Sequence, residues 1–487
     1  MWEQPSWLAA LWPWVGTALG LVVTVVAAAH VLLYKRDVRG AIGWVGIIVL
    51  APLLGALCYL LFGINRIRRR VRAHREDRPT HIDEAPHAVS RAQRRSLWPR
   101  ADSTGLSSLA RVVDQVTPRC LLLGNALTLL ENGDEAYPVM LRAIEEAQHS
   151  VALLTYIFDA DPWGERFVTA LNQAAVRGVE VRVLIDDAGA RYSRPPADRG
   201  LGDHTCLRAA RFLPIWGMRR SPYLNLRNHR KMLIVDGCSG FTGGLNIRAA
   251  CVMAMQAPYP VRDVHFAVQG PVVRHLMEVF AEDWDFAVHE RLVGQRWFPA
   301  LQPAGHMLAR GIADGPDRDF DVLRWTLLGA IACARERIRI VTPYFLPDAD
   351  LLAALNVAAM RGVEVDIVVP ARGNLAVVRW AMQAHLPLLH GRGCRIWLSP
   401  APFDHSKVMV VDRAWTLIGS GNWDDRSLRL NFEFCVECYC PTFGAQMDAW
   451  AKARIDAAQA MPAPPVRPQL SPTHLRNSAA RLLMPFL

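Results

Sequence analysis

The chain contains LNQAAVRGVEVRVLID at residues 171–186 and LNVAAMRGVEVDIVVP at residues 355–370, two segments that agree at nine of sixteen positions. Each runs from a helical stretch through Arg-Gly into a β-branched run, which is typical of a helix, a C-terminal glycine and a buried parallel strand. An apolar strand candidate precedes each copy, VALLTYIF at 151–158 and IRIVTPYF at 338–345. The repeat therefore predicts an α/β fold of two related domains, each a mixed β-sheet flanked by helices, with pseudo-twofold symmetry and a shared cleft.

A second repeated pattern follows each copy, NHRKMLIVDGCSGFTGGLN at 228–246 and DHSKVMVVDRAWTLIGSGN at 404–422. Counted from the histidine, the lysine lies 2 residues on, the aspartate 7, the glycine 14 and the asparagine 17 in both copies. The same residue types at the same offsets twice are a specific signal. These positions are His229, Lys231, Asp236, Gly243 and Asn246 in the first copy and His405, Lys407, Asp412, Gly419 and Asn422 in the second.

The spacing has a physical interpretation. On a strand, side chains two residues apart point to the same face, so each histidine projects together with its lysine. The aspartates have the opposite parity and lie where the strand turns, and a return strand brings each asparagine alongside. Brought together across the twofold axis, the imidazoles, ammonium groups and carboxamides would suit a phosphodiester. The histidines would supply a nucleophile and an acid, and the lysines and asparagines would bind the non-bridging oxygens.

Two carboxylates are candidates for orienting the histidines. A nucleophilic histidine needs its second ring nitrogen held by a carboxylate, which fixes the tautomer and stabilises imidazolium. Asp263 and Glu433 lie in apolar, strand-like surroundings, where an unpaired carboxylate is costly. We therefore expect each to bind a histidine. Ion pairs with the neighbouring Arg262 and Arg429 are the alternative.

The doubled pattern resembles the phospholipase D superfamily over roughly residues 105–455. The resemblance implies a covalent phosphohistidine on one histidine, protonation of the departing alcohol by the other, and no metal or other cofactor. It assigns His229 as nucleophile and His405 as acid, although the reverse order stays open. The first copy departs from the pattern, since it has Gly244 where the second has Ser420. The expected site is catalytic His229, Lys231, Asp236, His405, Lys407 and Asp412, phosphate-binding Lys231, Asn246, Lys407, Asn422 and Ser420, and histidine-orienting Asp263 and Glu433.

Two other enzyme classes are disfavoured by the sequence. No cluster of His, Asp and Glu with metal-ligand spacing accompanies the two histidines. No G-x-S-x-G pattern of a serine hydrolase occurs in the chain. The candidate chemistry therefore rests on the paired histidines alone.

The N-terminal region contains two apolar runs, 16–34 and 41–62, each long enough to span a bilayer, with Pro52 as a kink. They predict an uncleaved transmembrane helical hairpin, with a cleaved signal peptide as the rival for the first run. Six arginines between Arg66 and Arg75 favour a cytoplasmic location for everything that follows. The basic loop at 35–39 opposes this orientation, and a hairpin that dips into the bilayer without crossing would reconcile the two.

Length and charge limit the class of protein further. The chain has 487 residues, 52% of them hydrophobic, which is enough for two packed domains and a membrane segment. A formal net charge of +10 favours a phosphate-bearing partner, either nucleic acid or anionic lipid. We expect a membrane anchor over 1–75, a linker over 76–104, a first domain over 105–300, a second over 301–458, and a Pro-rich connector with a C-terminal amphipathic tail over 459–487.

Three longer stretches are similar to bacterial cardiolipin synthases: residues 35–70, residues 261–286 (VRDVHFAVQGPVVRHLMEVFAEDWDF) and residues 420–433 (SGNWDDRSLRLNFE). This resemblance implies transfer of a phosphatidyl group from one phosphatidylglycerol to the glycerol head of another. It also implies a multi-pass protein of the bacterial inner membrane whose partners are phosphatidylglycerol and anionic lipid, not nucleic acid. A phospholipase D that hydrolyses phospholipids or exchanges their headgroups is the main alternative. A membrane-tethered nuclease and a lipid-binding scaffold are further ones.

Overall fold

A computed structural model describes residues 6–35, 38–63, 105–214, 226–316, 319–462 and 471–484. The chain divides into two compact units, an N-terminal one up to His74 with 215–224 and a larger one with the remaining residues. The basic cluster and the linker expected over 76–104 lie outside the described residues. The cytoplasmic orientation inferred from that cluster therefore stays a prediction.

Among the described residues, one helix of the N-terminal unit is long and apolar enough to cross a bilayer. The described elements of this unit are α1 (Ser6–Tyr34), α2 (Val38–Leu50), α3 (Pro52–Cys58) and a π-helical turn (Tyr59–Gly63). The candidate span within α1 is Trp14–Tyr34, and only 6% of its most apolar window is buried. A spanning helix needs about 20 apolar residues. By that criterion α1 qualifies, whereas α2, with 13 residues, and α3, with 7, do not.

The sequence predicts a second spanning helix over 41–62 and therefore a multi-pass topology. The structure does not support this prediction, because the helix breaks at Ala51. This residue leaves the helical conformation (φ −139°, ψ 76°) because Pro52 disfavours the α region for the residue before it. The chain then folds back so closely that a Cβ at Gly55 would lie 2.5 Å from the carbonyl oxygen of Ile47. Tyr59 packs in the resulting apolar cluster, and its hydroxyl lies 2.9 Å from His30 Nδ1.

The larger unit is built on one 16-stranded mixed sheet that runs through both halves of the chain. Its first half contains α6 (Leu106–Val116), β1 (Leu122–Glu131), α7 (Asn132–Glu146), β2 (Ser150–Thr155), α8 (Pro162–Val176), β3 (Glu180–Asp186), β4 (Leu207–Phe212), β5 (Arg227–Asn228), β6 (Met232–Val235), β7 (Ser239–Gly243), β8 (Val261–Arg262), β9 (Val264–Gln269) and α9 (Val273–Val288). The second half contains β10 (Met307–Asp314), α10 (Val322–Cys333), β11 (Arg337–Val341), β12 (Phe345–Leu346), α11 (Ala349–Met360), β13 (Glu364–Pro370), α12 (Ala376–His385), α13 (Pro387–His390), β14 (Arg395–Ser399), β15 (Phe403–Asp404), β16 (Val408–Val411), β17 (Trp415–Gly419), β18 (Trp423–Asp424), α14 (Asp425–Arg429), β19 (Asn431–Tyr439), α15 (Pro441–Asp456), β20 (Gln459–Ala460) and α16 (Pro472–Arg481).

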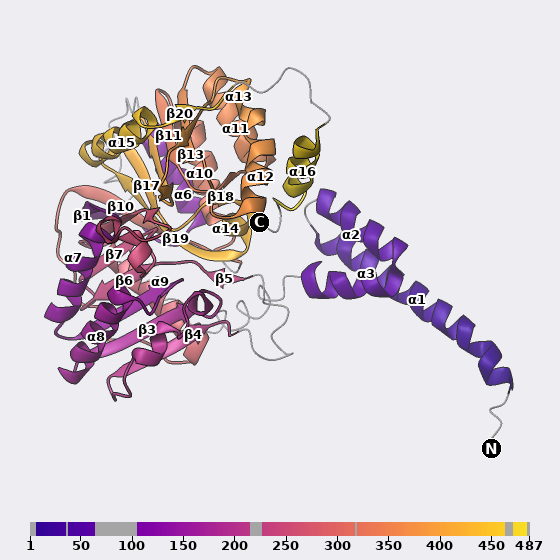
Figure 1. Ribbon diagram of the computed structural model, residues 1–487, viewed down its shortest axis with the longest axis horizontal. Helices are drawn as coiled ribbons and strands as arrows, with labels where there is room; N and C mark the ends of the chain where they lie inside the picture. The colour runs from indigo at the N-terminus through magenta and orange to yellow at the C-terminus, as the bar shows by residue number, and fades with distance from the viewer. Residues whose placement is uncertain are drawn as a thin grey trace. The chain divides into compact units, whose positions relative to one another are not determined.

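The strand order shows the pseudo-twofold symmetry. The antiparallel pair β1 and β10 lies in the middle of the strand order and is seen at the left of the larger unit in Figure 1. Outward from β1 come β9, β7, β6, β2, β3 and β4, and outward from β10 come β19, β17, β16, β11, β13 and β14, followed by β20. Three strands in each half are parallel to one another, β2, β3 and β4 in the first half and β11, β13 and β14 in the second. This arrangement confirms the predicted fold class. The domain boundaries near 300 and 458 stay a prediction.

The repeated segments form the predicted strand, helix, strand unit in both halves. Asp161 caps α8 and Asp348 caps α11, and each carboxylate accepts hydrogen bonds from two backbone N–H groups of the first turn. Each helix ends before a glycine with positive φ, Gly178 at 88° and Gly362 at 91°. The parallel strands that follow are buried, which places an apolar core beside the sheet in each half.

Candidate active site

Each of the two histidines follows a short strand that pairs with a strand from the opposite half of the chain. Strand β5 pairs with β19 of the second half, and β15 pairs with β8 of the first half. The N–H of His229 donates to the carbonyl oxygen of Phe432 at 2.9 Å, and that of His405 to the carbonyl oxygen of Arg262 at 2.7 Å. This register places each histidine beside the carboxylate that comes next on the strand of the opposite half.

Both expected carboxylates bind a histidine. Nδ1 of His229 lies 3.1 and 3.2 Å from the carboxylate oxygens of Glu433, and Nδ1 of His405 lies 2.7 Å from Oδ2 of Asp263. The two imidazole rings are 6.4 Å apart, centre to centre, and nearly perpendicular at 81°. Since Nδ1 of each ring faces a carboxylate, Nε2 is the nitrogen left for chemistry. Within the described residues the carboxylate partners of Arg429 are Asp348 and Asp425, not Glu433.

Glu433 is held much more firmly than Asp263. Its side chain is fully buried. It accepts hydrogen bonds from three further side chains, Ser420 Oγ at 2.5 Å, Ser427 Oγ at 2.9 Å and Asn431 Nδ2 at 3.1 Å. Burial alone would raise the pKa of Glu433, but His229, Lys231 and the hydroxyl donors outweigh it and lower that pKa to about 2. Glu433 is therefore a fixed anion behind His229.

The placement of Ser420 corrects the expectation that it binds phosphate. Its hydroxyl is fully buried and donates to Glu433, so it supports the carboxylate rather than the substrate. The equivalent Gly244 has no room for a side chain, because a Cβ there would lie 2.1 Å from Oδ1 of Asp263. Asp263 accepts instead from the N–H of Val264 at 2.8 Å. The first copy thus has glycine where the second has serine because the two halves hold their carboxylates differently.

The two lysines lie where the motif predicts, beside their own histidines. Nζ of Lys231 donates to the carbonyl oxygen of His229 at 2.6 Å. Nζ of Lys407 donates to the carbonyl oxygen of His405 and lies 2.8 Å from its Nδ1. Burial lowers the pKa of Lys231 to about 7 and that of Lys407 to about 8. An anion in the site would restore both charges.

Burial and the neighbouring lysines lower the pKa of both histidines, which favours their neutral forms. Burial and then the charge of Lys407 lower the pKa of His405 to about 3, against the opposing effect of Asp263. Burial and Lys231 lower the pKa of His229 in the same way, and Glu433 opposes them. A bound phosphodiester would offset the lysine charges and so raise both pKa values.

The asparagines differ in how their amides are used. Oδ1 of Asn246 accepts a hydrogen bond from the N–H of Ile157 at 3.0 Å. The amide nitrogen of Asn246 therefore points away from Ile157. Oδ1 of Asn422 is buried and has no hydrogen-bond partner among the described residues. Both side chains are less than a tenth exposed. They remain candidates for binding a non-bridging oxygen through their amide nitrogens.

Asp236 and Asp412 do not lie with the histidines, which corrects their place in the expected catalytic set. Both have positive φ, 52° and 50°, in the turn that ends the histidine strand. The carboxylate of Asp236 accepts from the backbone N–H groups of Gln148, His149 and Ser150. That of Asp412 accepts from those of Arg335, Glu336 and Arg337. Each therefore orders the start of the adjacent parallel strand.

Aromatic residues complete the walls of the site, and motif reasoning missed them. The ring of Tyr156 lies 5.0 Å from that of His229, edge to face, and the ring of Tyr344 lies 6.2 Å from that of His405. Phe403 also packs on His405, at 6.0 Å. The two tyrosines follow β2 and β11 but are offset by one position in the repeat, where Tyr156 matches Pro343 and Tyr344 matches Ile157, so comparing the two copies could not reveal them as a pair.

The lysine pKa values predict how anion binding depends on pH. Both lysines bind anions only when protonated, and they lose their charge as the pH rises through about 7 for Lys231 and about 8 for Lys407. Sulfate stays a dianion over this range. We expect its affinity, measured by calorimetry on the purified protein, to fall about tenfold or more from pH 6 to pH 9. Lys231→Met and Lys407→Met should each weaken binding at pH 6 and flatten the pH dependence. A pH-independent affinity that neither variant changes would contradict this assignment.

Within the described ranges, no group of three or more His, Cys, Asp and Glu side chains is arranged to hold a metal ion. Two oriented imidazoles, two buried lysines and two carboxylates are the groups that the site offers to a substrate. Facing histidines from the two halves of one pseudo-symmetric sheet define a phosphodiester-transferring enzyme of the phospholipase D class.

Comparison with known proteins narrows the class. A family model described as "Cardiolipin synthase, PLD-like domain" matches residues 140–284 and 327–455, and one described as "Phospholipase_D-nuclease N-terminal" matches 22–63. Cardiolipin synthase A of Pseudomonas aeruginosa is 32% identical over 89% of this chain and 87% of its own length. Cardiolipin synthase 1 of Bacillus cereus is 30% identical over 86% and 83%. The chain therefore belongs to the cardiolipin synthase family, the phosphatidyltransferases of the phospholipase D superfamily.

A solved structure supports the fold. Phosphatidylserine synthase of Haemophilus influenzae superimposes with a TM-score of 0.59 at 14% identity, covering 78% of this chain and all of that one. At this identity the likeness concerns the fold alone. Two pseudo-symmetric halves around one sheet are therefore an architecture that the chain shares with a solved protein.

Proposed function

We propose that the protein transfers the phosphatidyl group of one phosphatidylglycerol to the terminal hydroxyl of a second, forming cardiolipin and releasing glycerol. The observation that carries the proposal is the facing pair of imidazoles, 6.4 Å apart, each oriented by a carboxylate from the opposite half. The names of the relatives support the lipid substrates, and the apolar α1 supports a membrane location.

In the first step, Nε2 of His229 attacks the phosphorus of the donor lipid. The bond from phosphorus to the glycerol oxygen breaks, and His405 gives its Nε2 proton to that oxygen, so that free glycerol and a phosphohistidine result. The negative charge of the bound phosphodiester raises the pKa of His405 and so favours the protonated form, which takes its proton from solvent before the step and which burial and Lys407 otherwise disfavour. Lys231 and Lys407 stabilise the charge on the non-bridging oxygens.

In the second step, the terminal hydroxyl of the acceptor lipid attacks the phosphohistidine. His405, now neutral, takes the hydroxyl proton, the bond from phosphorus to Nε2 of His229 breaks, and cardiolipin is released. His405 thus acts on the leaving glycerol and then on the entering lipid, so both must reach the same side of the phosphorus. Water on that side would give phosphatidic acid instead.

The difference between the carboxylates supports His229 as the nucleophile. A phosphohistidine needs its ring fixed and its positive charge balanced while a product leaves and an acceptor enters. Glu433 has three further side-chain donors and a pKa of about 2, so it stays ionised throughout. Asp263 has a backbone donor in their place and suits a histidine that gains and loses a proton.

Incubation with phosphatidylglycerol alone tests the proposal. The purified protein in liposomes should convert it to cardiolipin and glycerol in equal amounts, as followed by mass spectrometry. Phosphatidic acid and glycerol in place of cardiolipin would identify a hydrolase. Absence of turnover with phosphatidylglycerol would overturn the proposed substrate. EDTA should leave the rate largely unchanged, since the scheme routes no step through a metal.

A further inference from the structure

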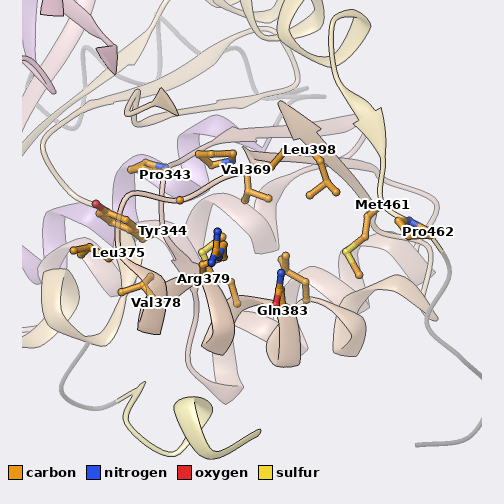
Figure 2. A pocket seen from close by; sticks show the side chains of 15 residues that line it. Pro343, Tyr344, Val369, Leu375, Val378, Arg379, Gln383, Leu398, Met461 and Pro462 are labelled. Atoms are coloured by element: carbon orange, nitrogen blue, oxygen red, sulfur yellow. The ribbon is translucent and has the colours of Figure 1, made fainter. Parts of the chain in front are cut away.

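An open pocket lies beside the active site in the second half, between α12 and the ends of β13 and β14 (Figure 2). It forms a cavity of about 210 Å³. Apart from Tyr344, Arg379 and Gln383, its lining side chains are apolar. Figure 2 shows Tyr344 and Leu375 at one end, Met461 and Pro462 at the other, and Arg379 between them. The pocket is therefore elongated and apolar, with one cation along its length.

The Tyr344 end of the pocket adjoins the catalytic centre. The ring of Tyr344 lies 6.2 Å from that of His405 in an edge-to-face contact. The hydroxyl of Tyr344 donates to Oδ1 of Asn374 at 2.8 Å, which fixes the ring between the pocket and the histidine. Tyr344 is thus shared by the pocket and by the wall of the active site on the side of His405, where the entering hydroxyl must lie.

Arg379 is the cation of this lining. Among the described residues, no carboxylate forms an ion pair with Arg379, and no hydrogen bond of its guanidinium occurs there. The neighbouring Gln383 is already engaged, since it accepts from Nδ2 of Asn477 in α16 at 3.0 Å. A guanidinium without a partner in apolar surroundings suits a phosphate group of a ligand.

The equivalent region of the first half is filled by polar contacts. Asp186 and Asp187 occupy the positions that Pro370 and Ala371 occupy in the second repeat. Asp187 forms ion pairs with Arg191 and Arg211, at 2.9 and 3.1 Å, and Asp186 accepts from the N–H of Asn228 at 2.8 Å. The pseudo-symmetry is thus broken at the place where the second half opens an apolar pocket.

We infer that this pocket binds the acceptor phospholipid, with its headgroup hydroxyl at His405, its phosphate at Arg379 and an acyl chain toward Met461. This order matches the order of groups along the lipid itself. The inference rests on the proposed function and deepens it, because it assigns the second lipid molecule to the half that supplies the acid. It also explains how a lipid hydroxyl is placed on that side in preference to water.

Filling the pocket tests the inference. Gly373 lines it, and a Cβ there would meet its nearest neighbour at 3.5 Å, an ordinary contact, so Gly373→Trp adds a ring without a backbone clash. Gly391→Trp is the matched control, because nothing lies within 4 Å of a Cβ at Gly391 and its φ is −79°. Two rates are measured: cardiolipin formation from phosphatidylglycerol, and exchange of labelled glycerol into phosphatidylglycerol, which needs no second lipid.

We expect Gly373→Trp to lower the ratio of cardiolipin formation to glycerol exchange about tenfold, and Gly391→Trp to leave it unchanged. Arg379→Met, a smaller change, should lower the same ratio and raise the phosphatidylglycerol concentration needed for half-maximal cardiolipin formation. An unchanged ratio in both variants would overturn the inference. If both rates also fell equally, the pocket would be assigned to the donor lipid instead. Failure of the proposed function would show differently, as exchange without cardiolipin in the unmodified protein.

Discussion

Substitution of His229 by alanine will abolish both glycerol exchange into phosphatidylglycerol and cardiolipin formation, because in the proposed mechanism the covalent intermediate forms on His229. His405→Ala will lower both rates by about 10²–10⁴, the usual contribution of general acid–base catalysis. The two histidines are distinguished by a phosphatidyl donor with a nitrophenol leaving group, which needs no acid. His405→Ala should release one equivalent of nitrophenol in a burst, and His229→Ala should release none.

A burst in His229→Ala and none in His405→Ala would reverse the assignment of nucleophile and acid. Full activity of either variant with phosphatidylglycerol would end the two-histidine mechanism. His149→Ala provides a matched control, because the side chain of His149 is exposed and only its backbone N–H contacts Asp236. Unchanged thermal unfolding of each variant would show that a lost rate reflects chemistry.

The sequence was sufficient to predict the fold class and the chemical groups that meet in the active site. The two Arg-Gly segments predict the strand, helix, strand unit, and the His-x-Lys spacing predicts that imidazole and ammonium share a face. The crossing of the carboxylates could not be predicted. It depends on β5 and β15, strands of two residues whose partners lie far away in the chain. Only the register of the assembled sheet places Glu433 at His229 rather than at the histidine of its own half.

The errors at Ser420, Asp236 and Asp412 have a common cause. A spacing pattern shows which residues recur, but it does not show whether their side chains face a substrate or the backbone. Ser420 supports Glu433, and each aspartate binds three backbone N–H groups. The prediction of a second spanning helix over 41–62 has another difficulty. The hydropathy of this run fits a membrane span, and only the packing of Gly55 on Ile47 shows that the chain folds back.

Glu433→Gln will lower phosphatidyl transfer by about 10³–10⁴, on the order reported for loss of the carboxylate in a catalytic triad. Ionised Glu433 accepts Nδ1–H of His229 and leaves the lone pair of Nε2 free to attack. A carboxamide can donate to Nδ1 instead, which moves the proton to Nε2 and removes the nucleophile. It also removes the charge that balances the phosphohistidine.

Asp263→Asn is the partner variant that tests the crossing itself. Because Asp263 orients His405, this change should impair proton transfer but spare attack on the nitrophenol donor, so that the burst is kept. Glu433→Gln should lose the burst. If the carboxylates served the histidines of their own halves, the pattern would be the opposite, with the burst kept in Glu433→Gln and lost in Asp263→Asn. The burst amplitudes of the two variants therefore decide between crossed and local pairing, because loss of stability would lower both alike.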